Sequence, residues 1–159
     1  MYISPRERPE RMYRRGREVV PDFAGSELLY LRYMSQHFVQ GELLPAGIRS
    51  QLKQSVNRGS FSEAEDALFS ETGKHDGLGV VEFRVGDVPE RVDQPQGPAY
   101  IFFMRHEPEE ENYSHSEIWS DHETRTGGFR APSRTVSLSF RVLLCRSIRQ
   151  EQIRIRAVR

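Results

Sequence analysis

Residues 81–85 read Val-Glu-Phe-Arg-Val, and this stretch sets the pattern of the second half of the chain. Its apolar and charged side chains alternate, which is typical of a β-strand with one buried face and one wet face. Gly86 and Pro89 follow and favour an end to the strand. From this point toward the C-terminus, the sequence therefore predicts a sheet.

Four more segments carry strand patterns. Residues 99–104 are almost continuously apolar, which is typical of a central strand. Residues 135–143 alternate most regularly, although a helix over residues 140–150 competes for the same apolar positions. We predict the strand there, and shorter strands over residues 115–119 and 153–156.

The first half shows helical spacing instead. Apolar residues recur every three or four positions over residues 26–40, with Ser26 as a good N-cap and Gly41 as a stop. A second helix is predicted over residues 48–56, and a short third one over residues 60–69 that begins with a capping box.

The expected fold class is therefore α+β, with N-terminal helices packed on one face of a mainly antiparallel C-terminal sheet. Residues 1–21 are rich in Arg, Glu and Pro and lack apolar periodicity, so we expect a flexible or peripheral arm. Residues 22–159 are long enough for one domain with a real core.

Charge is strongly segregated along a chain whose net charge is zero. Residues 1–17 carry a net +4, residues 60–123 carry −12 and residues 124–159 carry +8. The acidic middle and the basic ends could attract one another within the fold, or could form a basic face for an anionic partner.

The composition also limits the class of protein. No apolar run approaches the length of a membrane span, and the N-terminus lacks the apolar stretch of a signal peptide. The single cysteine, Cys145, excludes an internal disulfide and a four-cysteine zinc site. We expect a cytoplasmic protein that does not bind membranes.

Three of the five histidines lie between residues 106 and 123. His115 and Glu117 are two positions apart, so on a strand they share a face and can pass a proton as catalytic residues. Together with His106 and His122 they offer three nitrogens and one oxygen, a set suited to zinc or another divalent metal. The spacing matches no known metal signature.

Arginines of the C-terminal region form a candidate anion-binding group. Arg154 and Arg156 share one strand face, and Arg141 joins them if its strand lies alongside. Guanidinium groups suit phosphate or carboxylate.

The best specific hypothesis is a small hydrolase acting on a phosphodiester or nucleotide through the His/Glu cluster. The alternative is a non-catalytic module that binds a protein partner through its segregated charges.

A shorter pattern lies in the first predicted helix, where Arg32 and His37 are separated by four residues. This spacing resembles the Arg-x4-His motif of the HEPN family of RNases. The resemblance covers six residues, and Tyr33 stands where a polar residue usually follows the arginine. It implies an all-helical fold in which the arginine and the histidine position and protonate a phosphodiester.

Overall fold

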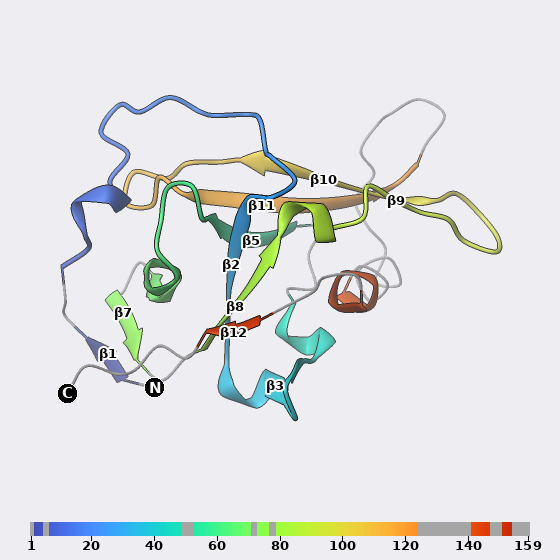
Figure 1. Ribbon diagram of the computed structural model, residues 1–159, viewed down its shortest axis with the longest axis horizontal. Helices are drawn as coiled ribbons and strands as arrows, with labels where there is room; N and C mark the ends of the chain where they lie inside the picture. Colours follow the sequence, from blue (N-terminus) through green and yellow to red (C-terminus); the bar gives the residue numbers. More distant parts are fainter. Residues whose placement is uncertain are drawn as a thin grey trace.

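The computed structural model describes residues 2–4, 7–48, 53–70, 73–76, 79–123, 141–146 and 151–153, with the backbone alone for residues 2–4, 76 and 151–153. Its centre is a seven-stranded sheet in the order β12-β8-β2-β5-β11-β10-β9 (Figure 1), in which every strand pair is antiparallel. In that order the strands are Glu151–Ile153, Gly79–Arg84, Leu28–Tyr33, Lys53–Arg58, His115–His122, Tyr100–His106 and Arg91–Val92.

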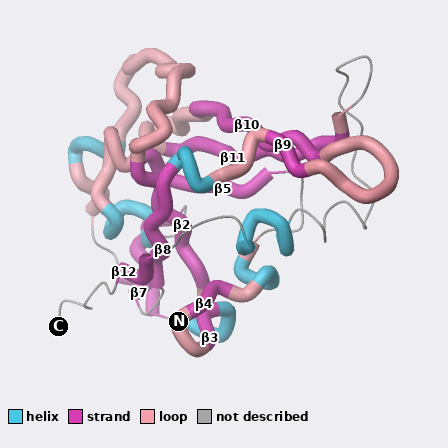
Figure 2. Tube along the Cα trace, turned by 45° about the vertical axis from the view of Figure 1, so that its right-hand side comes forward, coloured by secondary structure: helices cyan, strands magenta, loops and turns pink. Residues whose placement is uncertain are grey.

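Smaller elements surround this sheet. A three-stranded sheet is formed by β1 (Tyr2–Ser4), β7 (Gly73–Asp76) and β6 (Phe69–Ser70), and a hairpin by β3 (Phe38–Val39) and β4 (Glu42–Leu43). Short 3-10 helices lie at the strand connections (Figure 2). They are η1 (Glu10–Met12), η2 (Ser35–His37), η3 (Pro45–Gly47), η4 (Ala64–Leu68) and η5 (Val85–Asp87).

The main core lies on one face of the seven-stranded sheet. Because side chains alternate along a strand, Leu29, Leu31 and Tyr33 of β2 share this face with Val56 and Ile118 of the neighbouring strands. The opposite face carries Tyr30, which packs with Leu68 of η4 and Val80 in a smaller cluster. β2 is thus buried from both sides.

The expected N-terminal helices are wrong. Residues 28–33 form strand β2 and residues 53–58 form strand β5, while the third predicted helix is reduced to the 3-10 helix η4. A strand covered on both faces loses the alternation that would identify it, so the leucines of residues 26–40 matched helical spacing by coincidence. The helical setting that the HEPN resemblance implied for Arg32 disappears with the first helix.

Three of the strands predicted for the second half of the chain are confirmed. Those over residues 81–85, 99–104 and 115–119 correspond to β8, β10 and β11. The strand over residues 135–143 is wrong at its end: residues 141–146 are α-helical, and residues 124–140 lie outside the described part of the chain. The competing helical interpretation is the one that fits, because Leu144 of this helix is fully buried in the main core.

No helix in the described residues is both long and apolar enough to cross a membrane. That portion of the chain holds a single α-helical segment, residues 141–146, beside the 3-10 turns.

The N-terminal segment docks against the acidic middle of the chain. Met12 is buried, and its carbonyl accepts a hydrogen bond from the N–H of Tyr113. Arg11 donates two hydrogen bonds, 2.7 and 2.8 Å long, to the buried carboxylate of Asp66. Arg8 forms an ion pair with Glu111. Part of the charge segregation is therefore neutralised inside the molecule.

Candidate functional site

His106, at the end of β10, is a buried structural histidine. Its Nδ1 accepts a 2.9 Å hydrogen bond from the N–H of Val20, and its Nε2 lies 2.8 Å from the carbonyl oxygen of Tyr113. Because a carbonyl only accepts, the ring hydrogen is on Nε2. Burial lowers the pKa of His106, which favours this neutral form. Both ring nitrogens are therefore engaged within the protein.

His115 and His122 stand at opposite ends of β11. Seven residue steps along the strand lead from one to the other, which corresponds to about 23 Å. The ring of His122 stacks on Tyr100, with centroids 4.7 Å apart. His106 pairs in register with Ser116, so its side chain is on the face opposite to that of His115. The structure does not bring the three predicted imidazoles together, and no cluster of three metal-ligating side chains is found among the described residues.

Glu117 does share a face with His115, as the sequence predicted. It lies opposite Ser55 in the register of β11 and β5, and the Nζ of Lys53 approaches its two carboxylate oxygens at 3.4 and 3.3 Å. The Glu117 side chain is almost fully buried, whereas that of Lys53 is 45% exposed. Glu117 is thus engaged by a cation beside the site.

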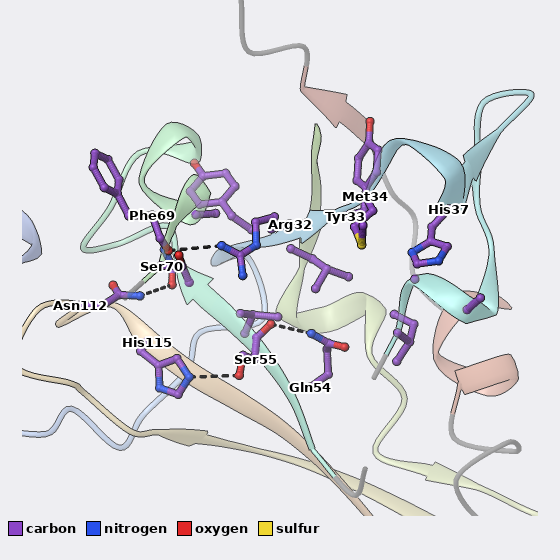
Figure 3. A pocket seen from close by; sticks show the side chains of 18 of the residues that line it. Arg32, Tyr33, Met34, His37, Gln54, Ser55, Phe69, Ser70, Asn112 and His115 are labelled. Atoms are coloured by element: carbon purple, nitrogen blue, oxygen red, sulfur yellow. Dashed lines mark hydrogen bonds between the residues drawn. The ribbon is translucent and has the colours of Figure 1, made fainter. Parts of the chain in front are cut away.

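A cavity of about 860 Å³ opens where β2 and β5 separate (Figure 3). These strands pair at two register positions, Leu29 with Arg58 and Tyr30 with Asn57, although β2 pairs with β8 along its whole length. Beyond Tyr30 the edges of β2 and β5 face the cavity instead of each other. Figure 3 shows Arg32 of β2 and Ser55 of β5 on its two sides.

The main chain of Ser55 also turns toward this opening. The N–H of Arg58 bonds to Ser114 on the β11 side, and the N–H of Gly59 bonds to Leu28 on the β2 side. Backbone groups alternate along a strand, so those of Ser55 point to the β2 side. The side-chain Nε2 of Gln54 donates a 2.9 Å hydrogen bond to the main-chain carbonyl of Ser55. The N–H of Ser55 points to the same side.

The wall of the cavity contains a serine–histidine pair. The Nε2 of His115 lies 3.2 Å from the Oγ of Ser55, and its Nδ1 lies 2.7 Å from the carbonyl oxygen of Glu107. The carbonyl fixes the ring hydrogen on Nδ1 and leaves Nε2 as an acceptor for the Ser55 hydroxyl. The carboxylate of Glu109 lies 3.5 Å from the same Nδ1. This is the arrangement of a nucleophile, a base and a group that orients the base.

The charged side chains among the described lining residues are mostly basic. They comprise the two arginines Arg32 and Arg141, against Glu109 alone. The Nε of Arg141 is buried and has no hydrogen-bond partner among the residues that the structure describes. Arg141 is the one predicted anion-binding residue that the structure places at this site. Arg154 and Arg156 lie outside the described residues.

A second serine–histidine contact lies beyond Arg32. The Oγ of Ser70, which lines the cavity, is hydrogen-bonded to Nε2 of His75. Arg32 donates a 3.4 Å hydrogen bond to the carbonyl of Phe69. Burial and the nearby charge of Arg32 both lower the pKa of His75. The polar end of the cavity is thus built around the Arg32 guanidinium.

The candidate site contains His115 and Arg141, which the sequence predicted as site residues, and Ser55, which it did not. The missing signal is physical: β5 reads Lys-Gln-Ser-Val-Asn-Arg and buries Gln54, Asn57 and Arg58. Buried polar residues remove the hydrophobic alternation that would have identified the strand.

The chain matches no protein-family model, no curated protein and no solved structure. Its function must therefore be argued from the geometry of this cavity.

Proposed function

We propose that this protein is a hydrolase of a phosphodiester in which Ser55 is the nucleophile and His115 its base. The observation that carries the proposal is the 3.2 Å contact between Ser55 Oγ and His115 Nε2 in the wall of a cavity. A basic lining supports an anionic substrate, because guanidinium groups bind phosphate oxygens through paired hydrogen bonds.

The reaction proceeds in two steps. The Oγ of Ser55 forms a bond to phosphorus while its proton passes to Nε2 of His115, and the bond to the leaving oxygen breaks as that oxygen takes the proton. Water then attacks the phosphorus of the resulting serine phosphodiester and gives a proton to His115; the bond to Ser55 Oγ breaks, a phosphate monoester is released, and the proton returns to Ser55. The Glu107 carbonyl keeps the ring oriented throughout.

Arg32 supplies positive charge on the side of the cavity across from Ser55. Charge develops on the phosphoryl oxygens during attack, and a guanidinium fixed beside them stabilises the transition state more than the ground state. The N–H of Ser55 is a second donor facing the same space.

The zinc site predicted from His106, His115, Glu117 and His122 is not part of this proposal. Both nitrogens of His106 are hydrogen-bonded, and His122 stands at the far end of β11 from His115. Arg8 and Arg11 form ion pairs with acidic residues of the same chain, so these two arginines do not add to a docking surface for a protein partner.

The test is hydrolysis of bis(4-nitrophenyl) phosphate, followed by release of nitrophenolate. We expect Ser55→Ala and His115→Gln each to lower the rate by at least about 100-fold, the contribution of positioned acid–base groups. Ser35→Ala, at an exposed serine, and His122→Gln, on the same strand as His115, are matched controls that should keep the wild-type rate.

Circular dichroism and the thermal midpoint must show that every variant is folded. A wild-type rate no higher than that of Ser55→Ala would overturn the proposal.

A further inference from the structure

The cavity has a second, apolar end. Tyr33, Met34, Ala46, Gly47 and Ile48 line it, from the end of β2 and from η3. Figure 3 shows Tyr33, Met34 and His37 on one side of the cavity, and Asn112 and His115 on the other. A ligand that fills both ends therefore needs a charged group and an apolar group within one small molecule.

The apolar end has a fixed aromatic wall. The Tyr33 ring stacks on Phe38 with centroids 4.9 Å apart and planes 22° apart. A Cβ added to Gly79 would overlap the Tyr33 ring, so the ring is packed between Phe38 and that glycine, and 5% of Tyr33 is exposed. Met34 adds an adaptable thioether beside it, and 43% of this residue is exposed. A thioether makes favourable contacts with aromatic rings, so the exposed Met34 favours a planar ring as the partner.

The size of the cavity agrees with one small molecule. Its volume of about 860 Å³ falls within the range of roughly 300–1,000 Å³ that is typical of small-ligand pockets. A nucleoside with one phosphate fits within this volume, with a planar base at one end and an anion at the other.

The polar end disfavours a longer polyanion. Glu107, Glu109, Glu110 and Glu111 are exposed on the connection that leads into β11 beside His115. The next phosphates of a nucleic acid strand leaving the cavity on this side would meet these carboxylates, and like charges repel. One phosphodiester between Arg32 and Ser55 meets only Glu109 of this connection, because the other three glutamates are not among the lining residues of the cavity.

We infer that the substrate is a mononucleotide phosphodiester, with its base in the apolar end and its phosphodiester between Arg32 and the Ser55–His115 pair. This inference rests on the proposed function. It adds that the protein recognises the base as well as the phosphate, and that it acts on single nucleotide units rather than on polymers.

The experiment uses full-length Ser55→Ala protein, which cannot turn the probes over, and measures binding by NMR titration. The probes are adenosine 3′,5′-cyclic monophosphate, dimethyl phosphate, adenosine and a single-stranded ten-nucleotide adenylate. We expect the cyclic nucleotide to bind at least about 10-fold more tightly than each of the other three, since both ends of the cavity contribute to its binding free energy.

Two further substitutions in the same background separate the two ends. Ala46→Trp fills the apolar end and should remove the advantage of the cyclic nucleotide while leaving dimethyl phosphate binding unchanged. Leu44→Trp, at an exposed position outside the lining, is the matched control. Arg32→Gln should weaken the cyclic nucleotide and dimethyl phosphate alike.

The outcomes distinguish this inference from the proposed function. Equal binding of the cyclic nucleotide and dimethyl phosphate, or tighter binding of the decamer, would overturn the mononucleotide assignment even if Ser55-dependent hydrolysis of bis(4-nitrophenyl) phosphate persists. A different result would overturn the catalytic proposal: the wild type hydrolyses bis(4-nitrophenyl) phosphate no faster than Ser55→Ala does, but the cyclic nucleotide still binds. The protein would then be a nucleotide-binding protein.

Discussion

Arg58 and Glu27 form a two-pronged ion pair in the interior of the protein. The Nε of Arg58 donates to Oε2 of Glu27 at 2.9 Å, and its Nη2 donates to Oε1 at 2.8 Å. The same guanidinium also donates to the carbonyls of Val20 and Asp22, and lies over the ring of Phe23. One side chain of β5 thus holds the segment that leads into β2.

The first prediction concerns this pair. Glu27→Gln should lower the free energy of unfolding by about 3–5 kcal/mol, because it leaves a buried guanidinium without a counter-charge. Burial alone would raise the pKa of Glu27, but hydrogen bonds from Arg58 and Ser60 outweigh it and hold the pKa below its usual value. Urea denaturation at pH 7 measures the loss. Glu42→Gln, at an exposed residue, should change stability little, and an equal effect of the two substitutions would contradict the prediction.

The second prediction concerns the docking of the N-terminal segment. Asp66 accepts hydrogen bonds from Arg11 and also from the N–H of Glu63 at the start of η4. Asp66→Ala should cost roughly 2–3 kcal/mol through loss of the cap and of the charged hydrogen bonds. Arg11→Ala should cost less, because the Arg11 side chain is 44% exposed.

The coupling between these two residues is measured by a double-mutant cycle in urea. The double variant should be more stable than the sum of the two single losses predicts. Strict additivity would mean that Arg11 and Asp66 do not act as a pair.

The third prediction follows from His106. Because burial lowers its pKa, the unfolded chain takes up a proton at a higher pH than the folded protein does. The contribution of His106 is therefore fully present above about pH 6.5, the ordinary value for histidine, and is lost as the pH falls toward the lower folded pKa. Unfolding free energies measured between pH 7.5 and 5 should decline with acid.

The His106→Gln variant tests the assignment of this pH dependence. Its slope should be shallower than that of the wild type by at most about 1.4 kcal/mol per pH unit, the limit for one proton. His75, whose pKa is lowered by burial and by Arg32, accounts for part of the remaining slope. Identical slopes for the two proteins would show that His106 does not titrate as described.

The fourth prediction concerns the cysteine. Burial raises the pKa of Cys145 to about 11, from an ordinary value of 9.0. Two pKa units correspond to about 100-fold less thiolate, the reactive form, so the native protein should react with iodoacetamide at pH 8 about 100-fold more slowly than the urea-unfolded chain does. Mass spectrometry of timed samples gives both rates, and comparable rates would contradict the placement of Cys145 against the core.

The sheet could be predicted where the strands have one wet face. In β8, Glu82 and Arg84 alternate with buried Val81 and Phe83, and the periodicity identifies the strand directly. In β2 the side chains on both faces are packed. Leucines and tyrosines therefore occupy both faces, and apolar and polar residues do not alternate along the strand. Partners distant in sequence, such as Val80 and Leu68 around Tyr30, decide that strand.

The site was predictable in the same uneven way. The pairing of His115 and Glu117 on one face follows from strand geometry and needs no tertiary information. The partner of His115 is Ser55, sixty residues earlier in the chain, and strand register alone brings the two together. His106 was grouped with His115 because it is near in sequence, but the turn between β10 and β11 places it on the other face.

Because β2 and β5 separate beyond Tyr30, several residues that line the cavity are not among those that pair these two strands. The cavity arises from backbone that leaves its ladder, so the Ser55 amide faces the opening whatever side chains surround it. Ala46 and Met34 line the cavity but are not among the paired residues of β2, β5 and β8, so a substitution at either position leaves the strand pairing unchanged. The binding preference that we propose can consequently be redesigned, or can drift during evolution, at little cost to the stability of the fold.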